Sequence, residues 1–236
     1  MHELTLSEIL TQAFVRSRDL DAPLAGRLEA FAESVRIASP EFADAVDRLI
    51  YRLQQCGTGA SAPKVGEIMP PFVLPDESGH LVSLEELLER GPAAVAFHRG
   101  HWCPYCRINT NALAKVQCEV EPLGAQIVAI TPDLQQFTVS MKSEAKERPF
   151  PVLTDIDNGY ALSLNLAIYV GEEMQKLMKG HGWDIAPFQG NESWIMPIPA
   201  TFIVGRDGVI VARFVDPDYR KRMAVEDIVD ALKAAA

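Results

Sequence analysis

The sequence predicts an α/β fold, in which helices cover both faces of a central sheet, preceded by a helical extension at the N-terminus. Residues 1–56 carry apolar side chains at helical spacing and show no strand-like run. From Val65 onward, short apolar runs of strand length alternate with helical segments. Near the end, two apolar runs flank the turn residues 206–208, Arg-Asp-Gly, and an amphipathic helix follows.

Composition excludes several classes of function. The chain has 236 residues, of which 48% are apolar and 23% charged, so it can bury a core of ordinary size. A formal net charge of −10 argues against nucleic acid or a membrane surface as the main partner, because both are bound by clustered Lys and Arg. The first residues lack the basic and apolar segments of a signal peptide, and no apolar run is long enough to span a membrane. We therefore expect a cytoplasmic protein, whose thiols are mostly reduced.

The extension is predicted to contain three helices. The third has Ser39 as its N-cap and Pro40 at its first position, and it stops at Gly57. The small residues that follow, GTGASAP, are typical of a linker. We expect residues 1–60 to form a helical extension with its linker and residues 61–236 to form the main domain.

The elements of the main domain are predicted from apolar runs and turn signals. In chain order we expect two short strands around a turn at 76–79, a helix, a buried strand at 93–97, a helix from 103 to about 122, a buried strand at 125–132, a helix at 134–146, a short extended segment at 150–155, a helix at 158–166, an irregular insertion at 169–197, the final hairpin and the closing helix.

Cys103 and Cys106 lie three residues apart where the predicted buried strand gives way to a helix. Unpaired N–H groups and the positive end of the macrodipole at a helix N-terminus stabilise a thiolate, so at least one of these thiols should titrate below the ordinary value. The spacing places the second sulfur one turn inside the helix, beside the first. A disulfide formed there can be reopened by another thiol, which predicts a redox pair.

Other interpretations of the cysteines remain open. The pair could be two buried structural thiols, or half of a zinc site completed by His98 and His101. Cys118 lies too far along the same helix to form a disulfide with Cys106, and we expect it to be a small core residue. Cys56 is interpreted as a helix-end residue, with a resolving role as the alternative.

Several segments resemble the alkyl hydroperoxide reductase/thiol-specific antioxidant (peroxiredoxin-like) family, which has the thioredoxin fold. They are KVGEIMPPFVLPDESGHLVSL, AFHRGHWCPYC, FPVLTDIDN and PIPATFIVGRDGVI. The segment Arg-Gly-X-Trp-Cys-Pro-Tyr-Cys is similar to a bacterial branch that carries a helical N-terminal extension. The resemblance implies a thioredoxin-like fold with a peroxiredoxin-like central sheet. It also implies that Trp102, Pro199 and Thr201 contact substrate, and that the Ile198–Pro199 bond is cis and lies beside the sulfurs.

The chain also departs from the family pattern. Laid on this sequence, the family's peroxidatic cysteine falls on Cys106, its threonine on Cys103 and its proline on Arg99. The family's distant arginine falls at or near Pro199 and is missing, and the buried acid of thioredoxin falls on Phe97 and is also missing. Helix electrostatics favour Cys103 as the attacking sulfur, whereas the resemblance favours Cys106. We expect the Arg99 guanidinium to replace the missing arginine.

The resemblance and the residues together predict a thiol-dependent peroxidase that reduces hydrogen peroxide or organic hydroperoxides. Cys103 and Cys106 would cycle between dithiol and disulfide, without a cofactor or metal, and thioredoxin or a glutathione-linked thiol would reduce the pair again. His98 or His101 would shuttle a proton near neutral pH. The alternatives are a disulfide oxidoreductase that acts on proteins and a binding module with little turnover. Because the extension has apolar faces to cover, we also expect a homodimer.

Overall fold

The computed structural model describes residues 4–144 and 150–236 of the chain. Three helices open it: α1 (Leu6–Arg18), α2 (Leu24–Ala38) and α3 (Pro40–Gln55). Thr5 and Glu8 form a reciprocal capping box at the start of α1, which satisfies two backbone donors that lack helical partners. Ser39 and Pro40 begin α3 as predicted, and Gly57 follows its end with a φ of 64°.

The remaining elements form the thioredoxin-like body. In chain order they are β1 (Val73–Pro75), β2 (Leu81–Ser83), α4 (Leu84–Arg90), β3 (Ala93–Phe97), α5 (Pro104–Val120), β4 (Gln126–Thr131), α6 (Gln135–Glu144), β5 (Val152–Thr154), α7 (Gly159–Ser163), β6 (Ala167–Tyr169), α8 (Glu172–Gly180), α9 (Ala186–Gln189), β7 (Ile195–Pro197), β8 (Ala200–Val204), β9 (Ile210–Val215) and α10 (Val225–Ala235), with short 3₁₀ helices at Glu121–Leu123 and Ile156–Asn158.

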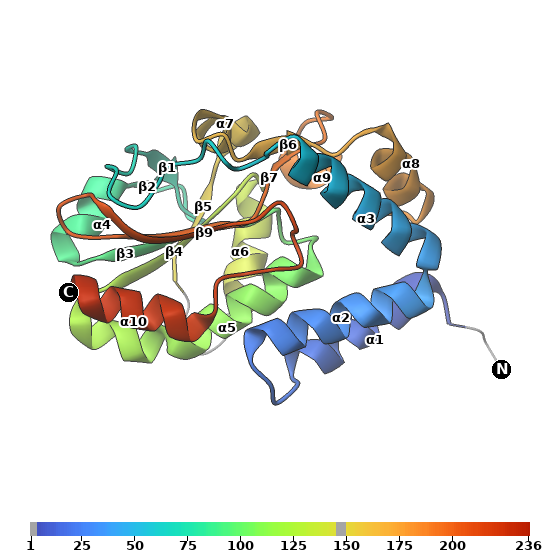
Figure 1. The fold of residues 1–236 in the computed structure, drawn as a ribbon, viewed down its shortest axis with the longest axis horizontal. Helices are drawn as coiled ribbons and strands as arrows, with labels where there is room; N and C mark the ends of the chain where they lie inside the picture. Colours follow the sequence, from blue (N-terminus) through green and yellow to red (C-terminus); the bar gives the residue numbers. More distant parts are fainter. Residues whose placement is uncertain (1–3, 145–149) are drawn as a thin grey trace.

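The central sheet has the strand order β5-β4-β3-β8-β9. Strands β3, β4 and β5 are parallel, and β8 runs antiparallel to both β3 and β9. Helices α5, α6 and α10 share one core with one face of the sheet, and α4 and α7 cover the other (Figure 1). Because both faces are covered, β3 is buried throughout and consists only of apolar residues. This confirms the predicted α/β class.

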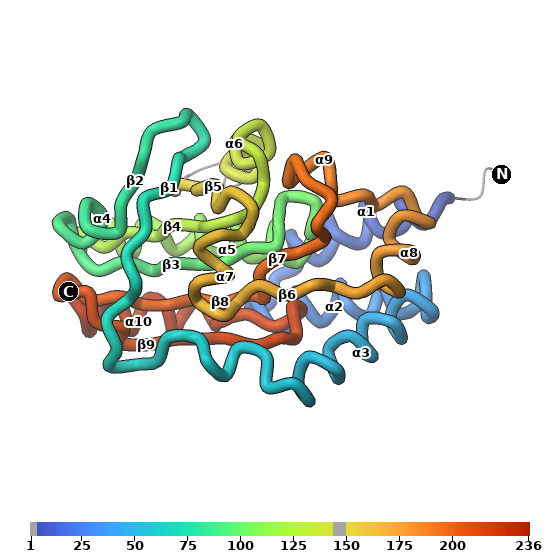
Figure 2. The backbone as a smooth tube through the Cα atoms, turned by 90° about the horizontal axis from the view of Figure 1, so that it is seen from above, coloured from blue at the N-terminus to red at the C-terminus, as the bar shows by residue number. Residues whose placement is uncertain are grey.

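The N-terminal helices lie at one end of the sheet, beside α8 and α9 (Figures 1 and 2). Helices α1 and α2 pack against α5, and α3 packs against α8. The Phe31 and Tyr105 rings meet edge to face with centroids 5.0 Å apart, and Arg27 Nη2 donates to Asn111 Oδ1 at 2.9 Å. The extension therefore shares a core with the main body, while the predicted division at residue 60 stays a prediction. Within the described residues, every helix is too short or too polar to cross a bilayer.

Two predictions about single residues are wrong. The Ile198–Pro199 bond is not cis: the described residues contain no cis peptide bond, and this one keeps the trans form that X–Pro bonds usually adopt, in the two-residue link between β7 and β8. Cys118 is exposed, not a core residue. Its helix buries Leu113 and Val120, and at about 100° per residue Cys118 points away from that face.

Two predicted segments also need revision. The insertion at 169–197 is more regular than expected, because it contains α8, α9 and β7. Met174 and Met178, one turn apart, are both buried on the inner face of α8. The helix expected at 134–146 is present as α6, and its expected end at residue 146 lies outside the described residues.

Candidate active site

Cys103 and Cys106 lie at the start of α5, directly after β3 and a short turn. Cys103 is the N-cap residue, and Pro104 occupies the first helical position. Proline suits this position because the backbone N–H that it lacks would have no hydrogen-bond partner within the helix. Gly100, in the turn, has a φ of 143°, and a Cβ there would collide with the indole nitrogen of Trp102 and with Asp133 Oδ1. The sheet and this turn thus fix both sulfurs at the positive end of the helix.

Cys106 is the thiol of the pair whose surroundings favour the thiolate form. The backbone N–H of Arg99 and the guanidinium Nη2 of Arg222 each donate to Cys106 Sγ, both at 3.3 Å. Burial by itself would raise the pKa of Cys106, but the hydrogen bond with Cys103 and the Arg222 charge outweigh it and hold that pKa well below its usual range. This agrees with the expectation that one thiol of the pair titrates low.

Cys103 has the opposite tendency. It is 1% exposed, and burial, followed by its hydrogen bond with Cys106, raises the pKa of Cys103 well above its usual range. The two thiols therefore titrate as one unit: the first proton leaves readily and the second is retained between the sulfurs. Loss of the first proton therefore leaves a negative charge that is favoured on Cys106.

The Arg99 side chain lies beside the pair without donating to Cys106. Its guanidinium carbon is 3.8 Å from the centroid of the Tyr219 ring and 4.9 Å from that of Trp102, and its Nε lies 3.1 Å from Met196 Sδ. Arg99 is 5% exposed, and although burial alone would lower its pKa, the charges of the two cysteines raise it. Arg99 thus contributes its backbone N–H and its charge, while Arg222 makes the direct side-chain contact.

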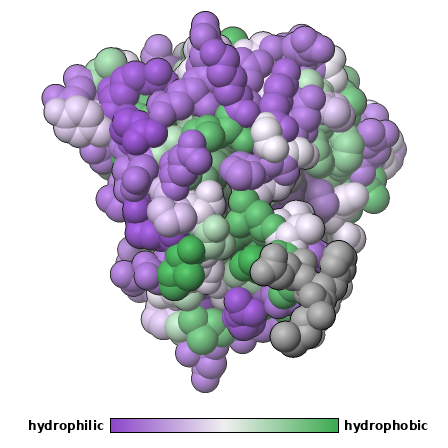
Figure 3. Space-filling model, turned by 90° about the vertical axis from the view of Figure 1, so that its right-hand side faces the viewer, coloured by the Kyte–Doolittle hydropathy of each residue, from purple (hydrophilic) through white to green (hydrophobic). Residues whose placement is uncertain are grey.

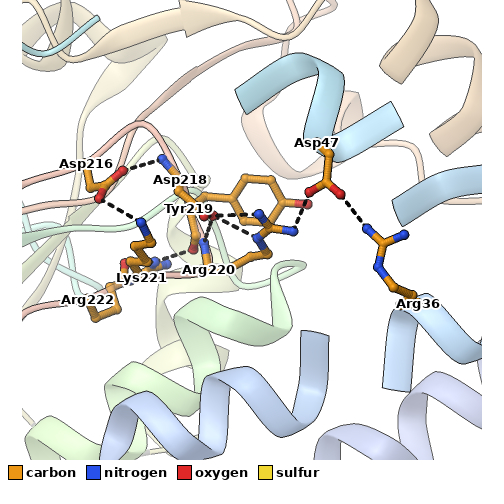
Figure 4. Close-up of polar contacts among 8 residues, drawn as sticks. All are labelled: Arg36, Asp47, Asp216, Asp218, Tyr219, Arg220, Lys221 and Arg222. Atoms are coloured by element: carbon orange, nitrogen blue, oxygen red, sulfur yellow. Dashed lines mark hydrogen bonds and ion pairs between the residues drawn. The ribbon is translucent and has the colours of Figure 1, made fainter. Parts of the chain in front are cut away.

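Arg222 and Tyr219 come from the segment between β9 and α10, which sequence reasoning missed. A network fixes this segment (Figure 4): Arg220 pairs with Asp218 and with Asp47 of α3, both at 2.8 Å, and Asp47 also pairs with Arg36 of α2. The family pattern directed attention to Pro199, and nothing local in the sequence links residue 222 to residue 106.

Of the two histidines considered for proton transfer, His98 lies in surroundings that disfavour that role. His98 is fully buried, with Asn109 Nδ2 3.0 Å from Nε2 and Thr110 Oγ1 3.4 Å from Nδ1. Burial lowers the pKa of His98 to about 4, which favours the neutral ring at pH 7 and disfavours the predicted shuttle role for this residue. Both ring nitrogens face these neighbours, which disfavours the zinc interpretation. The described residues contain no group of three or more His, Cys, Asp or Glu that could hold a metal.

Asp133 is a buried acid that the sequence analysis did not single out. Its Oδ2 accepts from the His101 backbone N–H at 2.6 Å, and Oδ1 has no hydrogen-bond partner among the described residues. Burial raises the pKa of Asp133 to about 7 despite this bond. The signal was available: Asp133 follows β4, and the carboxyl ends of parallel strands β3 and β4 meet at the same edge of the sheet.

We expect Asp133→Asn to change how stability depends on pH. A carboxyl whose folded pKa lies near 7, above its unfolded value of 3.8, stabilises the fold at low pH and loses that contribution as pH rises through 7. From pH 6 to pH 8 the free energy of unfolding of the parent should therefore fall by about 1–2 kcal/mol relative to the variant. Urea unfolding of both proteins at the two pH values measures this, and a constant difference between them would contradict it.

The other predicted site residues are less tightly gathered. Trp102 is half-buried and lies next to Arg99. Pro199 and Thr201 are buried at the start of β8, where Thr201 pairs with Ala96 of β3. A cavity lies between the N-terminal helices and the start of α5, and Cys103 is one of the residues that line it. Among its described lining residues, Trp102 is present, whereas Pro199 and Thr201 are absent. Their substrate contacts stay predictions.

Comparison with known proteins decides the family. The model of the AhpC/TSA family matches residues 65–213, which is more than half of the chain. The chain belongs to the AhpC/TSA family. Arg222, Tyr219 and helices α1–α3 all lie outside the match, although they complete the surroundings of the two cysteines. Comparison with curated proteins found no significant match.

Solved structures with a similar fold are peroxiredoxins of low sequence identity. Peroxidoxin BcpB from Mycobacterium tuberculosis is 19% identical with a TM-score of 0.54, and covers 73% of this chain and 98% of its own. Mycobacterium tuberculosis AhpC is 17% identical with a TM-score of 0.55, and covers 73% and 93%. Peroxiredoxin 6 of Arenicola marina is 13% identical with a TM-score of 0.58, and covers 72% of each chain. These likenesses support the fold.

Proposed function

We propose that this protein is a thiol-dependent peroxidase that works through Cys103 and Cys106. The observation that carries the proposal is the setting of the Cys106 sulfur, which accepts hydrogen bonds from the Arg222 guanidinium and from the Arg99 backbone N–H next to a second thiol. These contacts lower the pKa of Cys106. Thiolates, not thiols, attack peroxide bonds, and cations beside the sulfur stabilise the charge that develops on the peroxide oxygens. Membership of the AhpC/TSA family supports the same activity.

The reaction needs only the two sulfurs and a peroxide. One sulfur of the pair attacks the peroxide, which breaks the O–O bond, gives a sulfenic acid and releases an alcohol or water. The second sulfur then displaces the hydroxyl group, which leaves as water, and a disulfide forms. The i, i+3 spacing at the helix start holds the second sulfur within reach, so no large movement is required. A cellular dithiol, thioredoxin or a glutathione-linked thiol, then reduces the disulfide by exchange.

Stopped-flow reaction of the reduced protein with peroxide tests the proposal. Loss of two thiols per peroxide consumed, at a rate well above that of a free cysteine at the same pH, is the expected result. Reduction of insulin disulfides by the same preparation is the comparison. If insulin is reduced readily while peroxide reacts no faster than with free cysteine, the peroxidase assignment fails.

A second candidate function is a disulfide oxidoreductase that acts on proteins. The observation in its favour is Asp133, because a buried carboxyl with a pKa near 7 beside the helix start can exchange protons with a dithiol during disulfide exchange. The insulin comparison separates this candidate from the first.

We propose a homodimer for the full chain. Large apolar side chains remain exposed on the extension, among them Ile37 at 74% and Tyr51 at 64%. Burying them against a second copy would remove apolar surface from water. Light scattering of the full chain should give twice the chain mass, and Ile37→Glu together with Tyr51→Glu should shift the protein to monomer. A monomeric parent would contradict the proposal.

A further inference from the structure

A cavity of about 560 Å³ lies between the extension and the start of α5. Its walls are largely apolar, and they include Leu10, Phe14, Phe31, Val46, Met178 and Trp183. This volume is in the range of sites that enclose drug-sized ligands. On the side of the molecule seen in Figure 3, hydrophobic surface lies near the centre, and the surface above it and to its left is mainly hydrophilic.

The cavity reaches one cysteine of the pair and not the other. Cys103 lines it, with Arg99, Trp102 and Tyr219 around it, whereas Cys106 is absent from the described lining. Charged side chains of the lining pair or stack with neighbours: Arg36 pairs with Asp44 at 2.9 Å and Arg18 with Asp19 at 2.7 Å, and the guanidinium carbon of Arg107 lies 4.2 Å from the centroid of the Phe14 ring. The interior thus offers apolar walls with a guanidinium and a sulfur at one end.

We propose that this cavity binds the apolar body of a bulky organic hydroperoxide and presents its peroxide group to Cys103, so that helices α1–α3 select the substrate. This rests on the peroxidase function proposed above. Hydrogen peroxide has no apolar body and gains nothing from these walls, whereas an aromatic or long-chain hydroperoxide buries its hydrocarbon there. The binding energy is then available to hold the O–O bond against the sulfur.

The shared proton of the pair allows Cys103 to attack although the charge rests mainly on Cys106. The proton between the sulfurs passes from Cys103 to Cys106, which makes Cys103 the thiolate. Its electron pair forms a bond to the distal peroxide oxygen, the O–O bond breaks, and the leaving alkoxide takes the proton from Cys106. The Cys106 thiolate then attacks Cys103 sulfur and expels hydroxide, which leaves as water after taking up a proton. The dithiol loses two electrons, and the hydroperoxide gains them as alcohol and water.

Ala32→Trp tests the inference, and Ala25→Trp is the matched control. Both alanines belong to α2; Ala32 lines the cavity, whereas Ala25 is exposed and does not line it. Stopped-flow rates with cumene hydroperoxide and with hydrogen peroxide give a selectivity ratio for each protein. Calorimetry with cumyl alcohol, the product, measures binding without any redox step.

The parent should prefer cumene hydroperoxide to hydrogen peroxide. Ala32→Trp should lower this selectivity ratio about tenfold or more, which is within the discrimination that an apolar pocket can provide. Ala25→Trp should keep the parental ratio. Cys103→Ser should lose the preference, whereas Cys106→Ser should retain it at a lower overall rate. An unchanged ratio in Ala32→Trp, or a preference that persists in Cys103→Ser, would overturn the inference.

Failure of the two proposals can be told apart. If the parent reacts quickly with hydrogen peroxide but does not bind cumyl alcohol, the cavity proposal is overturned and the proposed peroxidase function is retained. If the parent binds cumyl alcohol and Ala32→Trp does not, while neither peroxide reacts, the cavity is supported as an apolar binding site and the proposed peroxidase function is rejected.

Discussion

Replacement of Arg222 by Met should slow the reaction of the reduced protein with peroxide by about 10²-fold at pH 7, the usual cost of removing one oriented donor at a reacting centre. Arg222 Nη2 lies 3.3 Å from Cys106 Sγ, and its charge is one of the reasons that the pKa of Cys106 is low. Without it the pKa of Cys106 should rise toward its ordinary value. Less thiolate is then present at pH 7, so the rate deficit should shrink as pH rises.

Lys221→Met is the matched control for this variant. It removes one positive charge from the neighbouring position, but Lys221 is 57% exposed and pairs with Asp216 at 3.6 Å. Stopped-flow rates and thiolate absorbance against pH should distinguish the two: only the Arg222 variant should shift the thiolate titration. An Arg222→Met protein that retains the parental titration would show that Arg222 does not stabilise the thiolate.

Arg99→Lys should also slow the peroxide reaction by about 10²-fold while preserving the positive charge. The Arg99 guanidinium stacks between Tyr219 and Trp102 at one end of the cavity, beside Cys103. An ammonium group lacks the planar surface for this stack and the fork of N–H donors that can bind a peroxide oxygen from two directions. Exchange of the disulfide with dithiothreitol should change much less, because that reaction develops no charge on a peroxide oxygen.

Arg206→Lys is the control for this second variant. Arg206 lies in the β8–β9 turn and donates to the carbonyl oxygen of Glu89, outside the cavity lining. Its peroxide reaction should stay close to that of the parent. Should Arg99→Lys react as fast as the parent, the Arg99 guanidinium has no part in peroxide activation and the disulfide-oxidoreductase candidate gains support.

The sequence predicts most of the body because the signals there are local. Strand β3 is a run of five apolar residues, and the turn before β9 carries a hairpin tripeptide. The position of Cys103 at a helix start follows equally from its neighbours, since Pro104 comes next. Each of these inferences needs only a few consecutive residues.

The rest of the site depends on contacts between distant residues. Arg222 is 116 positions from Cys106, and its role follows only from the packing of the segment after β9. The pKa of Asp133 depends on its burial, which cannot be predicted from the neighbouring residues in the sequence. The family pattern likewise led to a wrong prediction of a cis bond at Pro199, because the neighbouring residues in the sequence do not determine the isomer of an X–Pro bond and tertiary packing does.

The ion pair between Arg220 and Asp47 links the helical extension to the segment before α10. The family match ends at residue 213, and that segment lies beyond it. A recombinant fragment trimmed to residues 65–213 would keep both cysteines and the strands around them. It would lack Arg222, Tyr219 and the cavity wall formed by α1–α3. The matched region therefore supplies the framework that holds the two cysteines, and the groups around their sulfurs are complete only in the intact chain.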